Sequence, residues 1–383
     1  MTVDDLLFIA VGGAAASIAR AIAEETPVPM RTLILDTDDA VLQTLTPVAG
    51  LSATIFGAKR LGGRGTGGDR SLGAGALRDD AALVMAQVGS PRLAVVLVCC
   101  GGGTSGAVPI LLEMLRNQGI STMTFATMPF AFEGSDRLQC ATVMLPQLAS
   151  ASDSFARVPL ELLVDDALRS APAEEAFRAV RKRLAAAIAL FWTLLAQPGF
   201  IAFDIERFLR LLSGSSGVGL PCTFADVTCT GVDRAQTALA QLLASPRFRP
   251  EGVDRLANAT QVLVGVLAGE DLRLCELGTL MEGIRAHCPD AQEVMLGTSR
   301  EAPREGTLSV VVVAFSLPSA EIAEKGEALA LGGGKKASRR KASRAAPQLG
   351  VVKDRFTDVE HTVYNGQDLD VPTYQRRGIR LNR

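Results

Sequence analysis

Four short apolar runs near the start of the chain, each followed by a segment of helical pattern, constrain the fold more than any other feature of the sequence. The runs are LLFIAV (6 to 11), TLILD (32 to 36), LAVVLVC (93 to 99) and STMTFATM (121 to 128). Apolar strands that alternate with helices form a parallel sheet whose faces the helices cover. We therefore predict an α/β fold in which the carboxyl ends of these strands share one edge.

Glycine and acidic residues follow these strands, where open α/β sheets bind their ligands. Gly12-Gly13 follow the first run, Asp36-Thr37-Asp38 the second, and Gly101-Gly102-Gly103-Thr104 the third. The third segment precedes a helix predicted to start near Ala107, so its backbone N–H groups and the helix dipole suit a phosphate. A second glycine run, GRGTGG (63 to 68), could enclose the same phosphates. Each run taken alone is equally consistent with a flexible loop.

A long segment without Gly or Pro, residues 174 to 196, predicts one helix that stops at Gln197-Pro198-Gly199. After it, the predicted strands are CTFADVTCTG (222 to 231), QVLVGVLAG (261 to 269), AQEVMLGT (291 to 298) and TLSVVVVAFSL (307 to 317), with helices around 233 to 245 and 276 to 287. These patterns predict a first α/β domain over 1 to 173, a central helix over 174 to 197 and a second α/β domain over 198 to 318.

The tail has a different composition. Beyond residue 319 the apolar pattern stops, and cations accumulate between Lys335 and Arg344 with no acid among them. This predicts a disordered basic linker over 319 to 367, for which a solvated spacer is favoured over a membrane or DNA contact. The last segment, DLDVPTYQRRGIRLNR (368 to 383), regains aromatic and aliphatic residues, and a docking peptide is favoured over a frayed end.

Composition excludes several classes of function. The chain has 383 residues and a formal net charge of -2, which disfavours nucleic-acid binding. Its seven cysteines show no CxxC pair and it has only two histidines, so we expect reduced thiols and no protein metal site. No signal peptide is evident, and no apolar run approaches the roughly 20 residues that span a bilayer. We expect a cytoplasmic protein without direct membrane insertion.

The two commonest nucleotide fingerprints are absent, because the chain lacks GxxxxGK[ST] and AVGGAAAS is no GxGxxG. Instead, GGGTSGAVP (101 to 109) followed by TMPFAFEGSDR (127 to 137) resembles the tubulin signature loop of the FtsZ family and its KPFxFEGxxR segment. The resemblance extends over nearly the whole chain in the family's order. Further segments that carry it are DTDDAVL (36 to 42), GRGTGGDRSLG (63 to 73), AQPGFIAFDIERF (196 to 208), TGVDRAQTALAQLLASP (230 to 246), GEDLRL (269 to 274) and DLDVPTYQRRG (368 to 378).

This resemblance implies a tubulin/FtsZ-like fold: a Rossmann-like GTPase domain, a long central helix, a smaller second α/β domain and a disordered tail. It also implies a GTP/GDP site in the first domain, with Mg²⁺ as a candidate companion of the nucleotide. The residues implied are Gly12, Gly13, Asp38, Gly65, Gly67, Gly68, Gly101, Gly102, Gly103, Thr104, Gly106, Glu133, Arg137 and Arg181. Arg181 falls where the family has an Asn or Asp facing guanine, and an arginine cannot accept hydrogen bonds from the base.

Hydrolysis in this family needs acids from the loop after the long helix of a neighbouring subunit. TFADV (223 to 227) resembles the end of that loop, but the spacing from Phe177 to Pro198 places the loop at AFDIER (202 to 207). Asp204 then matches the first acid, while Arg207 stands at the second and Glu206 one position earlier. Two alternatives stay open: Glu206 substitutes in a shifted but working site, or turnover is slow or absent. Capping of helices is a further role for the aspartates, Asp36 and Asp38 included.

The resemblance implies a head-to-tail homopolymer that forms the bacterial division ring at midcell. It further implies membrane-tether division proteins bound through residues 368 to 377, and co-assembly with another FtsZ as an open possibility. Three functions are consistent with parts of the sequence: a GTP-hydrolysing filament, a nucleotide-binding filament scaffold that barely hydrolyses, and a Rossmann-like enzyme using NAD. The third is disfavoured, because no acid follows a true GxGxxG at ribose distance and no catalytic His or Cys emerges.

Overall fold

The computed structural model describes residues 3–26, 28–43, 49–214, 219–300, 305–316, 363–364 and 367–368. The chain forms two compact units, Met1–Gly333 and Gly334–Arg383. In the second unit, β11 (Val363–Tyr364) pairs antiparallel with β12 (Gln367–Asp368). The remainder of the predicted basic linker and docking peptide lies outside the described residues.

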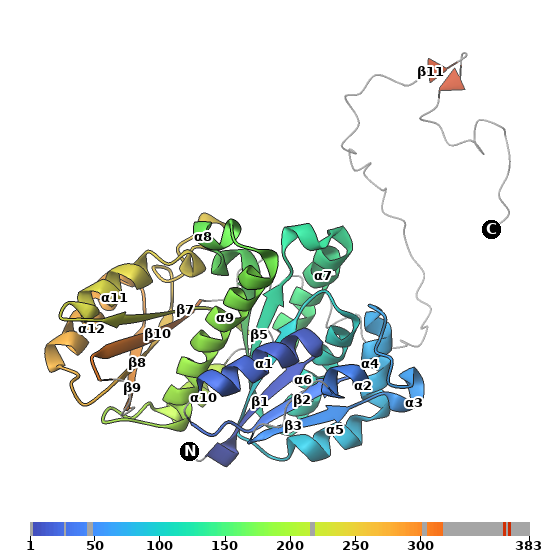
Figure 1. Ribbon diagram of the computed structural model, residues 1–383, viewed down its shortest axis with the longest axis horizontal. Coiled ribbons are helices and arrows are strands. Elements are labelled where there is room, and N and C mark those ends of the chain that lie inside the picture. Colours follow the sequence, from blue (N-terminus) through green and yellow to red (C-terminus); the bar gives the residue numbers. More distant parts are fainter. Residues whose placement is uncertain are drawn as a thin grey trace, which may run out of the picture. The chain divides into compact units, whose positions relative to one another are not determined.

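The first unit is built on one ten-stranded sheet with the order β3-β2-β1-β4-β5-β6-β7-β10-β8-β9 (Figure 1). Every neighbouring pair is parallel except those of β10, which runs antiparallel to both β7 and β8. The strands are β1 (Leu6–Val11), β2 (Thr32–Asp36), β3 (Leu51–Ile55), β4 (Leu93–Cys99), β5 (Ser121–Met128), β6 (Ser154–Pro159), β7 (Leu220–Thr230), β8 (Gln261–Ala268), β9 (Glu293–Arg300) and β10 (Thr307–Phe315). The predicted mixed α/β fold with a parallel-dominated sheet is confirmed.

Helices cover both faces of this sheet (Figure 1). They are α1 (Gly13–Glu25), α2 (Asp39–Gln43), α3 (Ala58–Leu61), α4 (Arg70–Asp79), α5 (Ala81–Val88), α6 (Val108–Asn117), α7 (Ser135–Ala151), α8 (Asp166–Arg169), α9 (Ala173–Ala196), α10 (Ile205–Ser213), α11 (Arg234–Leu243) and α12 (Leu274–His287), with a 3-10 turn η2 (Gly103–Ala107) before α6. Strands such as β1 and β4 are continuously apolar because helices bury both of their sides; β1 is buried at all six positions.

The predicted long helix is α9, which lies at the centre of the unit. Its first turns are mostly exposed, whereas its second half is buried against strands of both halves of the chain. Trp192 is fully buried there, and its ring meets that of Phe8 edge to face with centroids 6.4 Å apart. Since β6 pairs directly with β7, the sheet is continuous across the predicted boundary, and the division into two α/β domains stays a prediction.

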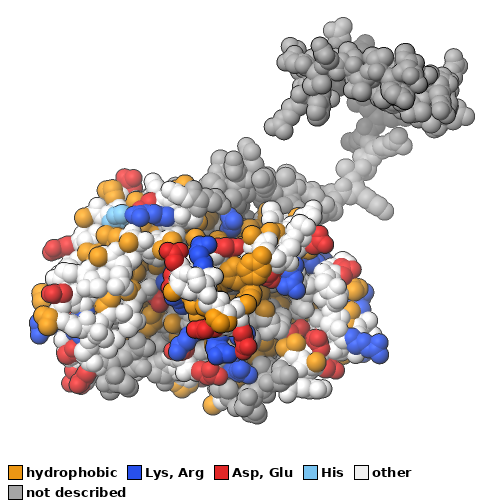
Figure 2. Space-filling view, turned by 45° about the horizontal axis from the view of Figure 1, so that its top comes forward, with side chains coloured by type: hydrophobic (Ala, Val, Ile, Leu, Met, Phe, Trp, Pro, Cys, Tyr) orange, Lys and Arg blue, Asp and Glu red, His pale blue; other side chains and the backbone are white. Residues whose placement is uncertain are grey.

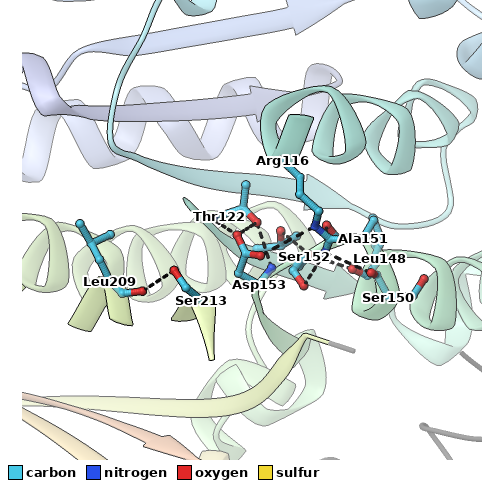
Figure 3. A network of polar contacts seen from close by, with 10 residues as sticks. Arg116, Thr122, Leu148, Ser150, Ala151, Ser152, Asp153, Leu209 and Ser213 are labelled. Carbon is cyan, nitrogen blue, oxygen red and sulfur yellow. Dashed lines mark hydrogen bonds and ion pairs between the residues drawn. The ribbon is translucent and has the colours of Figure 1, made fainter. Parts of the chain in front are cut away.

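Arg116 at the end of α6 ties three elements together at the amino edge of the sheet (Figure 3). Its Nη2 donates to the carbonyls of Ser150, Ala151 and Ser152 at 3.2, 2.7 and 3.2 Å, which are the unsatisfied acceptors at the end of α7. Asp153 accepts from both the amide and the hydroxyl of Thr122 at 2.8 and 3.0 Å, and so joins the starts of β5 and β6.

Replacing Arg116 with Met is expected to lower the free energy of unfolding by about 1 to 2 kcal/mol, because a cation no longer satisfies the carbonyls of a helix C-terminus. Chemical denaturation followed by circular dichroism measures this change. Arg169→Met is the matched control, since Arg169 is 65% exposed and its ion pair within the described residues is the 3.8 Å contact with Asp166. An equal loss in both variants would contradict the capping role.

Candidate functional site

A cavity of about 370 Å³ opens at the carboxyl ends of β1 and β4. Its walls come from the start of α1, the loop after β4, the segment after β5 and the first half of α9. Eight of the predicted site residues line it together: Gly12, Gly13, Gly101, Gly102, Thr104, Glu133, Arg137 and Arg181. The size is that of a small-molecule site, and its position is where open α/β sheets bind ligands.

One end of the cavity is suited to phosphate. Gly12 precedes α1 with φ of 90°, a left-handed value that favours glycine, and its carbonyl accepts the first bond of the helix from the amide of Ala16 at 2.9 Å. The amides of the first turn of α1 therefore have no intrahelical acceptor and point toward the cavity, at the positive end of the helix dipole. An anion is the natural occupant of such a helix start.

The loop 101–104 lies beside this helix start and contacts the segment that follows β2. The hydroxyls of Thr104 and Thr37 are 3.1 Å apart. Asp36, only 2% exposed, accepts from the amide of Thr37 at 2.7 Å, and burial raises the pKa of its carboxyl. Asp38 accepts from the amide of Ala40 at 2.9 Å at the start of α2, so it has the helix-capping role considered above.

The other predicted glycines do not line the cavity. A Cβ on Gly103 would lie 2.7 Å from the amide nitrogen of Asp69, and one on Gly106 would lie 2.2 Å from the carbonyl of Arg70. These glycines let the loop after β4 pack against the segment that starts α4. Gly65, Gly67 and Gly68 belong to that segment, where Asp38 forms a β-bridge with Arg64. Their contact with phosphates stays a prediction.

The opposite end of the cavity is formed mainly by α1 and α9. Arg181 donates to the hydroxyl of Ser17 at 3.2 Å and thereby bridges the two helices. Phe177 lies one turn earlier on the same face of α9, lines the cavity, and meets the ring of Phe130 edge to face at 5.4 Å. The sequence pattern does not single out Phe177 as a site residue, although its spacing of four from Arg181 places both on one helix face.

Glu133 and Arg137 lie at the mouth of the cavity and are paired. One carboxylate oxygen of Glu133 accepts from the amide of Phe130 at 2.9 Å and the other from Arg137 at 2.8 Å. Phe132, 74% exposed, stacks on Phe130 at the same rim. Figure 2 shows hydrophobic side chains gathered near the centre of one face, with basic and acidic side chains around them.

The predicted acid loop precedes α10. Asp204 caps that helix, because its Oδ1 accepts from the amide of Arg207 at 2.9 Å. Glu206 is held by both terminal nitrogens of Arg92, at 2.6 and 2.8 Å, and this guanidinium lowers the pKa of the Glu206 carboxyl. Arg207 pairs with Glu293 at 2.5 Å. The similar sequence TFADV lies inside β7, whereas AFDIER spans the loop before α10 and the first turn of that helix.

The acid loop and the cavity lie at opposite ends of the sheet. Between Arg181 at the cavity and Ala196 at the end of α9, the helix advances roughly 22 Å. Beyond α9, the pairing of Glu206 with Arg92 places α10 beside the amino end of β4. Figure 1 shows α9 running from α8 at the top to α10 at the bottom. Asp204 is therefore too far away to touch a ligand in the cavity of its own chain.

Comparison with known proteins agrees with this geometry. The model of the Tubulin/FtsZ family GTPase domain matches residues 6–165, and that of the FtsZ family C-terminal domain matches residues 227–317. The chain belongs to the tubulin/FtsZ family. It is 30% identical over 256 residues to the cell division protein FtsZ of Buchnera aphidicola subsp. Schizaphis graminum, a match that covers 67% of this chain and 65% of that protein.

Solved structures show the same fold for this FtsZ-like chain. An empty FtsZ dimer from M. jannaschii superposes with a TM-score of 0.73 at 22% identity, covering 89% of this chain and 95% of that one. The GTPγS-bound protofilament of CetZ2 from Haloferax volcanii gives a TM-score of 0.66 at 20% identity, covering 87% and 98%. The predicted tubulin/FtsZ-like fold is thus confirmed.

The two cysteines that line the cavity of this FtsZ-like chain are not suited to covalent catalysis. Burial raises the pKa of the Cys99 thiol to about 11 and that of Cys100 to about 12, so both thiols stay protonated at neutral pH and are poor nucleophiles. Within the described residues there is no cluster of three His, Cys, Asp or Glu side chains that could hold a metal, and no helix long and apolar enough to cross a bilayer.

Proposed function

We propose that this FtsZ-like protein binds GTP and GDP in the cavity at the carboxyl ends of β1 and β4. The phosphates would lie against the start of α1 and the loop 101–104, and the base between Phe177 and Arg181. Asp38, Glu133 and Arg137 would lie near the ribose and phosphates. The free amides and the arginine fit an anionic ligand, and Mg²⁺ brought by the nucleotide would neutralise part of its charge.

We further propose that the chains assemble head to tail, with the Asp204 loop of one subunit over the cavity of the next. The observation that carries this is the separation of the two half-sites at opposite ends of one sheet, since only a second copy can bring them together. A contact between two different faces of identical subunits repeats from one subunit to the next, and it gives a filament when its rotation does not close into a ring.

Hydrolysis would then follow assembly. The Asp204 carboxylate would orient and polarise a water molecule toward the terminal phosphate, while the amides at α1 and the loop 101–104 stabilise the charge that develops. Phosphoryl transfer depends mainly on such positioning and electrostatic stabilisation. In the free monomer Asp204 lies far from the cavity of its own chain, so the monomer is expected to be nearly inactive.

In the cell, the filament would form the bacterial division ring at midcell, on the cytoplasmic side of the membrane. Membrane-tether division proteins would bind through residues 368–377, and another FtsZ could enter the same filament. The family models and the FtsZ relatives support this role.

The test is phosphate release from GTP by the purified full-length chain, with light scattering recorded in the same cuvette and ATP as the control. Both signals are expected to rise with GTP and to depend on protein concentration in the same way. Phosphate release without scattering, at a rate per subunit that does not change with protein concentration, would rule out a site completed by assembly.

One observation favours a second candidate, a filament scaffold that binds nucleotide but barely hydrolyses it. Glu206, the acid nearest to the missing second catalytic position, has both oxygens bound by Arg92, and its depressed pKa makes it a weak base. Arg207 cannot act as a base at any cellular pH. Scattering without phosphate release would favour this scaffold.

Replacing Arg92 with Met tests whether the ion pair restrains Glu206. If Glu206 can serve the neighbouring cavity, its release is expected to raise phosphate release per subunit about 3-fold to 10-fold, because a free carboxylate is a better base. Arg60→Met is the control, since Arg60 also binds an exposed carboxylate in bidentate fashion, through Nε and Nη2 to Asp79 at 2.8 and 3.2 Å, far from the acid loop. Unchanged turnover in Arg92→Met would mean that Glu206 takes no part in hydrolysis.

A further inference from the structure

The base end of the cavity offers hydrogen-bond donors but no carboxylate or amide acceptor. Among the lining residues there, Ile18, Leu160, Phe177, Val180 and Leu184 are apolar, which leaves Ser17 and Arg181 as the polar side chains. A guanidinium carries five N–H donors and no acceptor. In the described part of the chain its one hydrogen bond to a side chain goes to Ser17, which leaves further N–H donors of this cavity-lining residue available to a ligand.

The acid nearest to this end cannot supply the missing acceptor. Glu133 is the single carboxylate that lines the cavity, and its two oxygens already accept from Phe130 and Arg137. Drawing Glu133 toward a base would break both bonds and leave Arg137 unpaired. The hydroxyl of Ser17 can accept a bond, but a hydroxyl cannot receive two adjacent N–H groups as a carboxylate does.

Purine bases differ in how they match such a surface. Guanine presents the acceptors O6 and N7 on one edge and the donors N1–H and N2–H₂ on another, whereas adenine places an amino group beside N7. Hypoxanthine keeps O6 and N7 but lacks the 2-amino group. Arginine pairs in bidentate fashion with O6 and N7, the commonest specific contact that it makes to guanine.

We propose that Arg181 recognises the O6 and N7 acceptors of a 6-oxopurine, so that the site takes guanine and hypoxanthine nucleotides alike and disfavours adenine nucleotides. The 2-amino group of guanine does not contribute to binding, because the one carboxylate that lines the cavity already accepts hydrogen bonds from other groups. This rests on the proposed function, since it concerns the base of the nucleotide placed in the same cavity. The position of Ser17 agrees with this placement of the nucleotide. Ser17 lies about 6 Å along α1 from Gly13, so the base would bind about one helical turn away from the phosphates.

The experiment measures equilibrium binding of GDP, IDP and ADP to the purified full-length chain by isothermal titration calorimetry. Diphosphates are used so that neither hydrolysis nor filament growth affects the result. The dissociation constants of GDP and IDP are expected to agree within about 3-fold, with that of ADP at least 10-fold higher. Arg181→Met is expected to raise the dissociation constants of GDP and IDP by the same factor, about 10-fold. Arg181→Asp is expected to bind GDP more tightly than IDP, since the new carboxylate can accept a hydrogen bond from the 2-amino group.

Lys182→Met is the matched control, because Lys182 is the next cation on α9, pairs with Glu25 at 3.4 Å and does not line the cavity. It is expected to leave all three affinities unchanged. A wild-type chain that binds GDP more than 10-fold tighter than IDP overturns the proposal without any variant, as does an Arg181→Met variant with unaltered affinities. If no purine diphosphate binds at all, the proposed nucleotide site is wrong. This outcome differs from tight GDP binding with weak IDP binding, which contradicts only the proposed role of Arg181.

Discussion

Replacing Asp204 with Asn is expected to reduce phosphate release from GTP by about 100-fold to 1,000-fold, while GDP binding and the stability of the chain stay unchanged. Asn caps a helix as well as Asp does, so the bond to the amide of Arg207 is retained. The variant loses only the negative charge that would polarise the attacking water. Because the proposed site takes Asp204 from a neighbouring subunit, the fall in turnover should appear at protein concentrations where the filament is fully formed.

Two further variants separate catalysis from capping. Asp165→Asn makes the same change in an aspartate that caps α8, through the amide of Leu168 at 2.9 Å, and should leave turnover unaltered. Asp204→Ala removes the cap as well, and should cost about 1 kcal/mol of stability in addition to the activity. Mixing wild-type chains with a small excess of Asp204→Asn chains should lower the activity of the wild type. Normal turnover in Asp204→Asn filaments would remove Asp204 from the mechanism.

The strands that could be predicted from sequence are those whose apolar runs stand between clear breaks. β1, β2, β4 and β5 were predicted to the residue, because each is a continuous buried run that ends at a glycine, aspartate or proline segment. β3, at the edge of the sheet, is half exposed and lacks such a run. β6 was missed because SFARVP contains an exposed arginine and a proline, features that usually argue against an interior strand.

The glycine loops of the site could be predicted from the sequence. The contacts that determine what each loop or acid does could not. Glycine pattern alone does not distinguish the proposed phosphate contact at Gly12 from the packing that Gly103 needs against Asp69. The partner of Glu206 lies 114 positions away in the sequence, and no local pattern indicates it. Such contacts depend on how α10 packs against the amino edge of the sheet, which is a property of the whole fold.

Replacing Arg234 with Met is expected to lower the free energy of unfolding by about 3 to 5 kcal/mol. Arg234 is the first residue of α11 and is 4% exposed, and it binds Glu276 through two nitrogens at 2.6 and 2.9 Å. Glu276, 8% exposed, also accepts from the amide of Arg273 and so caps α12. Removing the guanidinium leaves this carboxylate buried without its counter-charge. Urea denaturation at pH 7.5 measures the loss, with the exposed Arg249→Met as control.

The pH dependence of this loss identifies its cause. The Arg234 guanidinium holds the pKa of Glu276 below its usual value near 4.5, so in the wild type the pair stabilises the fold above that value and the contribution is lost as the pH falls through the lowered pKa. In Arg234→Met, burial without the cation raises this pKa instead, and the variant should regain stability relative to the wild type as the pH falls from 7.5 toward 5.

A double variant decides between an uncompensated charge and lost packing. Arg234→Met combined with Glu276→Leu replaces the buried pair with apolar side chains, and such replacements are often neutral or stabilising. It should recover most of the stability lost in Arg234→Met. Asp271, which also binds Arg234 at 2.7 Å, is 40% exposed and can be solvated when the cation is removed. If the double variant is as unstable as the single one, the network acts through shape rather than charge.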